Sequence, residues 1–238
     1  MRESGRQLAV VLEYLKNEVA VGMSTKDLAV LAAEKLKQLG GKPAFLGYYG
    51  FPDVICISVN DEVVHGIPRL NKIIKEGDIV SLDFGVKVDG MITDAAISVV
   101  VGTTKNSEKK KLVDATEQSL RAGIEEIKSG VQVGTIANAI ELVLKKQQYG
   151  VVRDLVGHGV GHEVHEEPNI PNYGKKNTGM RLLAGMTIAV EPMSTLGGEA
   201  ILTDNDGWTI RTRDGSMSAH FEHTILITET GYEILTKI

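Results

Sequence analysis

The chain has 238 residues, of which 42% are hydrophobic and 24% charged, and its formal net charge is −5. This composition is typical of a globular α/β chain with one large domain or two small ones, and the absence of a long basic run argues against nucleic acid as the main ligand. No apolar run approaches the ~20 residues that span a bilayer, the charged N-terminal segment predicts neither signal peptide nor anchor, and the single Cys56 fits a reducing compartment.

The first part of the chain is expected to begin with two amphipathic helices. Apolar residues recur at helical spacing over residues 8–19 and again over residues 28–39. Ser24 is a suitable N-cap for the second helix, because an acidic residue follows three positions later. An aromatic-rich loop at residues 43–52 and a short strand through Cys56 follow.

Residues 78–102 are predicted to form a β-hairpin with two carboxylates on one face, because Asp89-Gly90 is a typical hairpin turn. Asp83 and Asp94 lie directly opposite each other if the turn centres on Val88-Asp89, and they are diagonal neighbours if it centres on Asp89-Gly90. Their Cβ atoms would be about 5 to 8 Å apart. A shared proton, a nearby Lys or Arg, or a bound cation would relieve the repulsion, and a cation is the interpretation that we favour.

The second part of the chain repeats the order of the first. One helix is expected to begin near Ser107, and another is expected to be capped by Thr135 and closed by Gly150, before further strands. The order helix, helix, strands therefore occurs twice, roughly 110 residues apart, which is too long for a solenoid repeat. We predict one domain built from two similar halves, about 1–104 and 105–238, with a pocket between them.

Histidines and further carboxylates gather in the β-rich parts of the chain. Residues 157–168 read GHGVGHEVHEEP, which fits neither phosphate-loop pattern. A histidine taken singly is more often a surface or satisfied core residue, but three within eight residues favour chemistry. Glu191 ends one strand-like run and Glu222 interrupts another, and a carboxylate is rarely buried without a partner. The simpler alternatives are that Glu191 caps a strand end and that Glu222 pairs with His223.

The four carboxylates and one or more histidines form an oxygen-rich set of candidate ligands. The carboxylates are Asp83, Asp94, Glu191 and Glu222. Such a set suits divalent ions, and four carboxylates exceed the need of one ion. They are appropriate for two ions that share bridging carboxylates and a water molecule, so the residues indicate a two-metal hydrolase.

Several segments together resemble the signature of a known family. They are SVNDEVVHGIP, DIVSLDFG with the downstream ITDAA, GHGVGHEVHEEP, AVEPM and SAHFEHTILIT. In this order, and over nearly the whole chain, they resemble type I methionine aminopeptidases, which belong to the pita-bread metallopeptidases. The resemblance implies an α+β pita-bread fold in which two helix-helix-strand halves surround a central antiparallel sheet, as a single catalytic domain.

The resemblance also implies a role for individual residues. The matching metal ligands are Asp83, Asp94, His158, Glu191 and Glu222, with Asp94 and Glu222 bridging. They would hold two divalent ions, which the sequence does not distinguish among Co, Mn, Fe, Ni and Zn. A metal-bound hydroxide would attack the scissile carbonyl, Glu191 would shuttle the proton, and His65 and His165 would contact the substrate and stabilise the intermediate. The histidines without a catalytic match, expected to be structural, are His162, His220 and His223.

The family's methionine pocket has counterparts in this chain. The matching residues are Tyr48, Phe51, Cys56 and Trp208. A thioether suits such a polarizable apolar pocket, although plain core packing is an equal alternative for the aromatic residues. Phe45 departs from some relatives, which have a small residue there, and a phenyl ring would narrow the pocket. A monovalent-cation site built partly from backbone carbonyls has its counterparts at Asn60, Glu62 and Ser218.

The activity implied is removal of the N-terminal methionine from nascent proteins whose second residue is small, by a cytoplasmic monomer near the ribosome. One alternative is an Xaa-Pro aminopeptidase or prolidase, but these relatives normally have a large N-terminal domain that this chain lacks. Another is a metal-free binding protein on the same scaffold, but such proteins usually lose ligands that are present here. The short N-terminus is the main departure from the family.

Overall fold

The computed structural model describes residues 1–102 and 107–237, and the predicted boundary between the halves at 104/105 lies outside them. The helices are α1 (Arg2–Glu18), α2 (Thr25–Leu39), α3 (Glu108–Glu125) and α4 (Val133–Lys146), with a short 3-10 turn at Tyr48–Gly50. The strands are β1 (Lys42–Pro43), β2 (Cys56–Val59), β3 (Glu62–Val64), β4 (Ile79–Val88), β5 (Met91–Val100), β6 (Gly150–Val151), β7 (Gly157–Gly159), β8 (Glu166–Ile170), β9 (Thr187–Val190), β10 (Met193–Thr195), β11 (Ile201–Thr203), β12 (Ile210–Thr212), β13 (Ser218–His220), β14 (Glu222–Ile227) and β15 (Tyr232–Ile234).

The helix caps test the local predictions. Ser24 caps α2 as expected, in a capping box with Asp27, whose side chain accepts the Ser24 backbone N–H. The prediction that Thr135 caps the fourth helix was wrong, because α4 begins at Val133 after Gln132. The Thr135 hydroxyl instead accepts the backbone N–H of Asn177 at 3.1 Å, so this residue holds a neighbouring loop against the helix.

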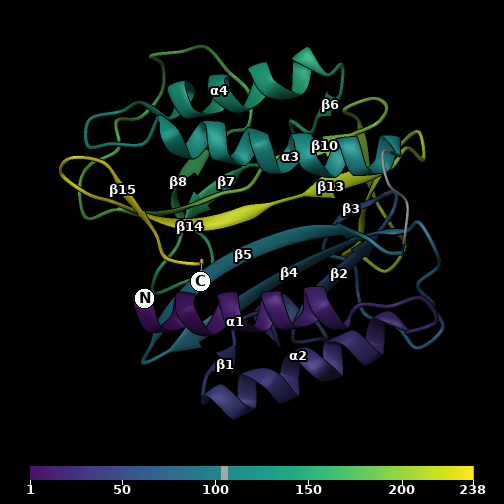
Figure 1. The fold of residues 1–238 in the computed structure, drawn as a ribbon. Helices are drawn as coiled ribbons and strands as arrows, with labels where there is room; N and C mark the ends of the chain where they lie inside the picture. The colour runs from purple at the N-terminus through teal and green to yellow at the C-terminus, as the bar shows by residue number, and fades with distance from the viewer. Residues whose placement is uncertain (103–106, 238) are drawn as a thin grey trace.

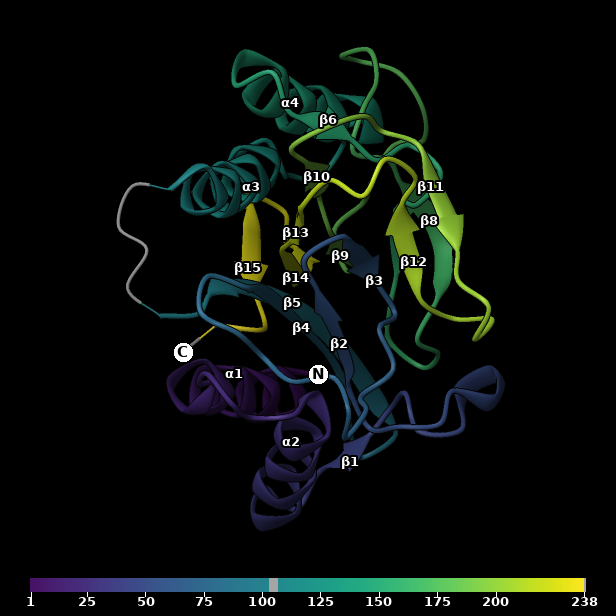
Figure 2. The ribbon, with the colours of Figure 1, turned by 90° about the vertical axis from the view of Figure 1, so that its right-hand side faces the viewer.

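The two halves of the chain meet in one antiparallel sheet. Its main path is β1-β4-β5-β14-β9-β7-β8, with β2 beside β4 and β15 beside β14. Strand β5 comes from the first half and β14 from the second, and they pair through Ala96↔Glu222 and Ala95↔His223. Helices α1 and α3 lie on one side of this sheet, and β11 and β12 lie on the other (Figures 1 and 2). The predicted arrangement of two helix-helix-strand halves around an antiparallel sheet is confirmed.

The β4–β5 hairpin resolves the two registers that the sequence left open. Val88 pairs with Met91, so Asp89 and Gly90 form the two-residue turn, and both have positive φ angles of 49° and 83°. Asp94 pairs with Gly85 and Asp83 pairs with Ala96. The two aspartates are therefore diagonal neighbours on the same face of the hairpin, as the second of the two registers predicted.

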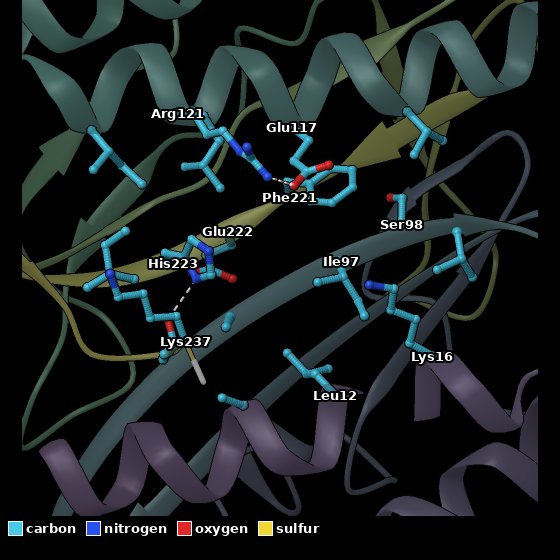
Figure 3. Close-up of a pocket in the computed structure, with 18 of the residues that line it drawn as sticks. Leu12, Lys16, Ile97, Ser98, Glu117, Arg121, Phe221, Glu222, His223 and Lys237 are labelled. Carbon is cyan, nitrogen blue, oxygen red and sulfur yellow. Dashed lines mark hydrogen bonds and ion pairs between the residues drawn. The ribbon is translucent and has the colours of Figure 1, made fainter. Parts of the chain in front are cut away.

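The outer face of the sheet is only partly covered. Helices α1 and α3 pack over β5 and β14 but leave a groove of about 930 Å³ between them (Figure 3). Ile97 and His223 lie on its floor, Glu222 lies beside His223, and charged residues line its rim. None of the helices in the described part of the chain has the length and apolar character required to cross a membrane.

The backbone around His65 is fixed by a close approach of two strands. The Gly66 N–H donates to Ser58 Oγ at 3.0 Å, and the Gly66 carbonyl accepts the Ile57 N–H at 2.8 Å. A Cβ on Gly66 would lie 2.4 Å from the Ile57 carbonyl oxygen, which is backbone and cannot swing away. His65 itself has a φ of 58°, so this short segment is held in an unusual conformation by its packing.

Gly66→Ala is therefore expected to destabilise the protein by roughly 1–3 kcal/mol, because the added methyl group forces the segment after β3 away from Ile57 of β2. Thermal unfolding would measure the change. Gly231→Ala is the matched control, since nothing lies within 4 Å of the added Cβ, and it should leave stability within about 0.5 kcal/mol. Equal unfolding midpoints for the two variants would contradict the proposed close contact.

Candidate metal centre

Five of the predicted site residues come together on the inner face of the sheet. Asp83 lies on β4, Asp94 on β5, His158 on β7 and Glu222 at the start of β14, and Glu191 directly follows β9. Ligand atoms of Asp94, His158 and Glu222 all lie within 4.8 Å of one another. His158 Nε2 is 3.4 Å from Glu191 Oε1, and Asp83 lines the same cavity. The two halves of the fold therefore both contribute to one cluster of carboxylates and imidazole.

The carboxylates of this cluster lack the partners that buried charges require. Asp83 Oδ1, Asp94 Oδ1 and Glu222 Oε1 are buried without a hydrogen-bond partner. Burial raises the pKa of Asp94 to about 6. Burial, reinforced by the negative charge of Asp94, raises the pKa of both Asp83 and Glu222 well above its usual range. Orphaned oxygens converging from three strands fit a bound cation, which would satisfy them together.

Glu191 differs from the other carboxylates because histidines surround it. Burial alone would raise its pKa, but the neighbouring His220 and His158 outweigh burial and hold the pKa of Glu191 below its usual range. His158 Nδ1 lies 2.8 Å from the Gly159 carbonyl oxygen, so Nδ1–H donates to that carbonyl. The neutral ring then presents the Nε2 lone pair to the carboxylates, which is the tautomer that a metal-ligating histidine uses.

A small apolar cavity opens beside the cluster. Its volume is about 160 Å³, and it is lined by Phe45, Tyr48, Tyr49, Phe51, Cys56, His65, Asp83, Asp94, His158, Val164, His165, Glu191, Trp208 and Glu222. The rings of Phe51 and Trp208 meet edge to face, with centroids 5.2 Å apart. Burial raises the pKa of the Cys56 thiol well above its usual range, so this residue forms an uncharged wall. All the residues predicted for the methionine pocket thus line one cavity with the cluster.

The two histidines predicted to contact substrate lie along this cavity. Tyr48 Oη is 3.0 Å from His165 Nδ1, and burial lowers the pKa of His165 to about 4. In the tautomer of the neutral ring in which the tyrosine hydroxyl donates to Nδ1, Nε2–H is left as a donor. The rings of His65 and Trp208 have centroids 6.4 Å apart. Each imidazole is thus placed by an aromatic residue of the pocket.

Some lining residues were not anticipated from the sequence. Tyr49 and Val164 line the cavity, and only the density of aromatic residues in the 43–52 loop pointed toward the first of them. His220 was expected to be structural, yet its Nε2 lies 3.5 Å from Glu191 Oε2. The alternation of side chains along β13 and β14 was the available signal, because residues 220 and 222 share a face. His162 is exposed and His223 faces the outer groove.

The residues predicted for a monovalent cation are neighbours. Ser218 Oγ lies 2.9 Å from the Asn60 carbonyl oxygen and 3.0 Å from that of Glu62. The Glu62 carboxylate is engaged elsewhere, with Lys72 Nζ at 2.6 Å and Arg211 Nη2 at 2.9 Å. The carbonyl oxygens of Asn60 and Glu62 therefore both lie beside the Ser218 hydroxyl, and the role of these residues in cation binding stays a prediction.

Comparison with known proteins defines the class. Residues 1–229 match the model of metallopeptidase family M24, and the chain belongs to this family. It is 47% identical over 238 residues to methionine aminopeptidase 1 of Bacillus subtilis, covering 100% of the chain and 95% of the relative. It is 45% identical over 248 residues to the methionine aminopeptidase of Aquifex aeolicus, with the same coverages.

Solved structures agree with this assignment. The crystal structure of the methionine aminopeptidase from Thermotoga maritima superposes with a TM-score of 0.97 at 46% identity, covering 100% of this chain and 95% of the other. The resemblance read from the sequence is confirmed. The prolidase from Pyrococcus furiosus shares the fold, with a TM-score of 0.78 at 23% identity, and this chain covers 62% of it.

The orphaned carboxylates predict an unusual effect of Asp83→Asn. Without metal, this change removes a buried carboxyl group that folding forces either to stay ionised beside Asp94 or to take up a proton, and it should raise the unfolding midpoint by about 2–4 °C, which corresponds to ~1 kcal/mol at this chain length. The same variant should lose the rise in midpoint that divalent ions produce in the parent. Asp89→Asn, at the exposed hairpin turn, is the matched control and should preserve both midpoints. A lower midpoint for metal-free Asp83→Asn would contradict the electrostatic account.

Proposed function

We propose that this chain is a metal-dependent aminopeptidase that removes methionine from the N-terminus of peptides and newly made proteins when the second residue is small. The observation that carries the proposal is an apolar pocket of Phe51, Cys56 and Trp208 that opens onto the carboxylate cluster. An unbranched thioether side chain suits a pocket of this chemistry and of about 160 Å³. The relatives at 41–47% identity over the whole chain are named methionine aminopeptidases, which supports this substrate.

The residues that would hold two divalent ions are Asp83, Asp94, His158, Glu191 and Glu222. Ions bound there supply a Lewis acid that polarises the scissile carbonyl and activates water. The donor set suits Mn, Fe, Co, Ni or Zn. We also propose a monovalent cation at the backbone carbonyls of Asn60 and Glu62, beside Ser218.

The chain's own side chains then position the peptide and move the proton. The methionine side chain lies among Tyr48, Phe51, Cys56 and Trp208, and the ring of Phe45 lines and narrows this pocket. His165 donates through Nε2–H to the carbonyl oxygen as negative charge develops, and Tyr48 holds the ring in the required tautomer. His65 contacts the scissile amide, and Glu191 accepts a proton from the attacking water and passes it to the leaving amine.

We further propose a cytoplasmic monomer of one catalytic domain that acts on chains emerging from the ribosome. One buried cysteine and a negative net charge are consistent with this setting. The second candidate activity, cleavage next to proline, has weaker support. The prolidases and the X-Pro aminopeptidase that share the fold are only 18–23% identical to this chain, and the chain covers 60–62% of them.

Metal dependence is the first expected outcome. Chelator-stripped protein should release no methionine from Met-Ala-Ser, and addition of Mn²⁺, Co²⁺, Fe²⁺, Ni²⁺ or Zn²⁺ in turn should restore release with at least one ion. Asp94→Asn should abolish release, because it removes a bridging ligand. Faster cleavage of Xaa-Pro peptides than of Met-Ala-Ser would replace the proposed activity with the proline-directed one.

Loss of the proposed oxyanion donor should separate chemistry from metal binding. His165→Ala is expected to lower kcat by roughly 10²-fold or more while metal content, measured by elemental analysis, stays near that of the parent. Tyr48→Phe should have a smaller effect in the same direction, because the ring loses only the bond that orients it. Loss of metal in His165→Ala would show that the residue is a ligand instead.

A further inference from the structure

The Glu191 carboxylate lies between two imidazoles, one at each oxygen. His158 Nε2 is 3.4 Å from Oε1, and His220 Nε2 is 3.5 Å from Oε2. The His220 side chain is 2% exposed and that of Glu191 is 13% exposed, so water does little to screen either group. Within residues 1–102 and 107–237, these two imidazoles are the basic groups that lie within 4.0 Å of this carboxylate.

Only one of the two imidazoles has a proton available for Glu191. The Nδ1–H of His158 is committed to the Gly159 carbonyl oxygen at 2.8 Å, so the neutral His158 ring has no hydrogen at Nε2. Both ring nitrogens of His220 are buried without a hydrogen-bond partner. His220 can therefore carry its proton at Nε2 without losing another bond, and Glu191 Oε2 is the acceptor that this nitrogen faces.

The backbone fixes the distance between these two residues. His220, at the end of β13, pairs with Met193 of β10, two residues after Glu191. Ser98 Oγ accepts the His220 N–H at 2.9 Å and donates to the His220 carbonyl oxygen at 2.8 Å, which anchors β13 to β5. The backbone of His220 is thus bonded to β5, the strand that carries Asp94, so its position relative to the carboxylate cluster is fixed.

We propose that His220 is a positioning residue for Glu191: its Nε2–H faces Glu191 Oε2 at 3.5 Å, donates to that oxygen when the two side chains approach, and so keeps Oε1 directed toward His158. The inference rests on the proposed function, because it concerns the carboxylate that moves the proton. A donor at one oxygen restricts rotation of a carboxylate, so it favours both the ligand position of Oε1 and its proton-accepting orientation. Loss of such an outer partner typically costs about 10–100-fold in metal affinity or activity.

The decisive comparison is between His220→Leu, which removes the donor at similar volume, and His220→Gln, which keeps an N–H donor. His220→Leu should lower kcat for Met-Ala-Ser by ~10–100-fold with KM within about 2-fold of the parent. His220→Gln should keep kcat within about 3-fold of the parent, since its amide restores the bond. His162→Leu, at an exposed histidine, is the matched control and should behave as the parent.

Metal affinity provides a readout that does not depend on hydrolysis. Calorimetric titration of chelator-stripped protein with Mn²⁺ should show binding roughly 10-fold weaker in His220→Leu than in His220→Gln. The unfolding midpoint of each variant is measured together with its kcat and its Mn²⁺ affinity. His220→Met serves as a second donor-free variant if the leucine variant does not fold. If the parent protein binds Mn²⁺ but fails to release methionine with any of the ions tested, the proposed function is wrong. The comparison of Mn²⁺ affinities would still test the role of His220.

Three results would overturn the inference. Equal losses in the leucine and glutamine variants would show that His220 acts through shape alone. Unchanged kcat and Mn²⁺ affinity in the leucine variant would show that Glu191 needs no donor. A rise in KM with kcat preserved would show that His220 contributes to substrate binding and does not position Glu191.

Discussion

The structure depends on the cost of burying several carboxylates at one point of a continuous sheet. Asp83 and Asp94 project from one hairpin, and Glu222 joins them because β14 pairs with β5 at Ala96. Their orphaned oxygens repel one another, and no described Lys or Arg is paired with these three side chains. A divalent ion bound among these oxygens would replace their mutual repulsion with attraction to the ion. Because ligands come from both halves of the chain, the same ion would also join the halves at the β5–β14 seam.

Much of this arrangement follows from local rules that can be read in the sequence. The turn at Asp89-Gly90 sets the hairpin register, and period-two alternation then places Asp83 and Asp94 on one face. Helical periodicity and the Ser24 cap set the start of α2. The identity of the cluster required the resemblance to a family, because the pairing of β5 with β14 joins residues more than 120 positions apart and no local pattern encodes it.

The predictions that failed or fell short share a physical cause. Thr135 has the right chemistry for an N-cap, but a tertiary bond to Asn177 takes its hydroxyl, and α4 begins two residues earlier. His220 was assigned a structural role because no family role matched it, although its parity with Glu222 places it on the inner face. His223, one residue beyond Glu222, faces the outer groove (Figure 3). Parity along a strand indicates which face a side chain occupies, whereas contacts across strands determine which groups it meets.

The proposed methionine pocket is held in shape by polar contacts as well as by its apolar walls. Arg211 on β12 binds Asp61 at 2.9 Å and the buried Glu62 at 2.9 Å, which ties the β11–β12 hairpin to β3. The same hairpin carries Trp208, and β3 leads directly into His65, so one charged network sets the distance between two walls of the pocket. Separating the buried Glu62 carboxylate from one of its cationic partners would cost free energy, so this network resists rearrangement. Methionine selectivity would then depend on residues that touch neither the methionine nor the metal.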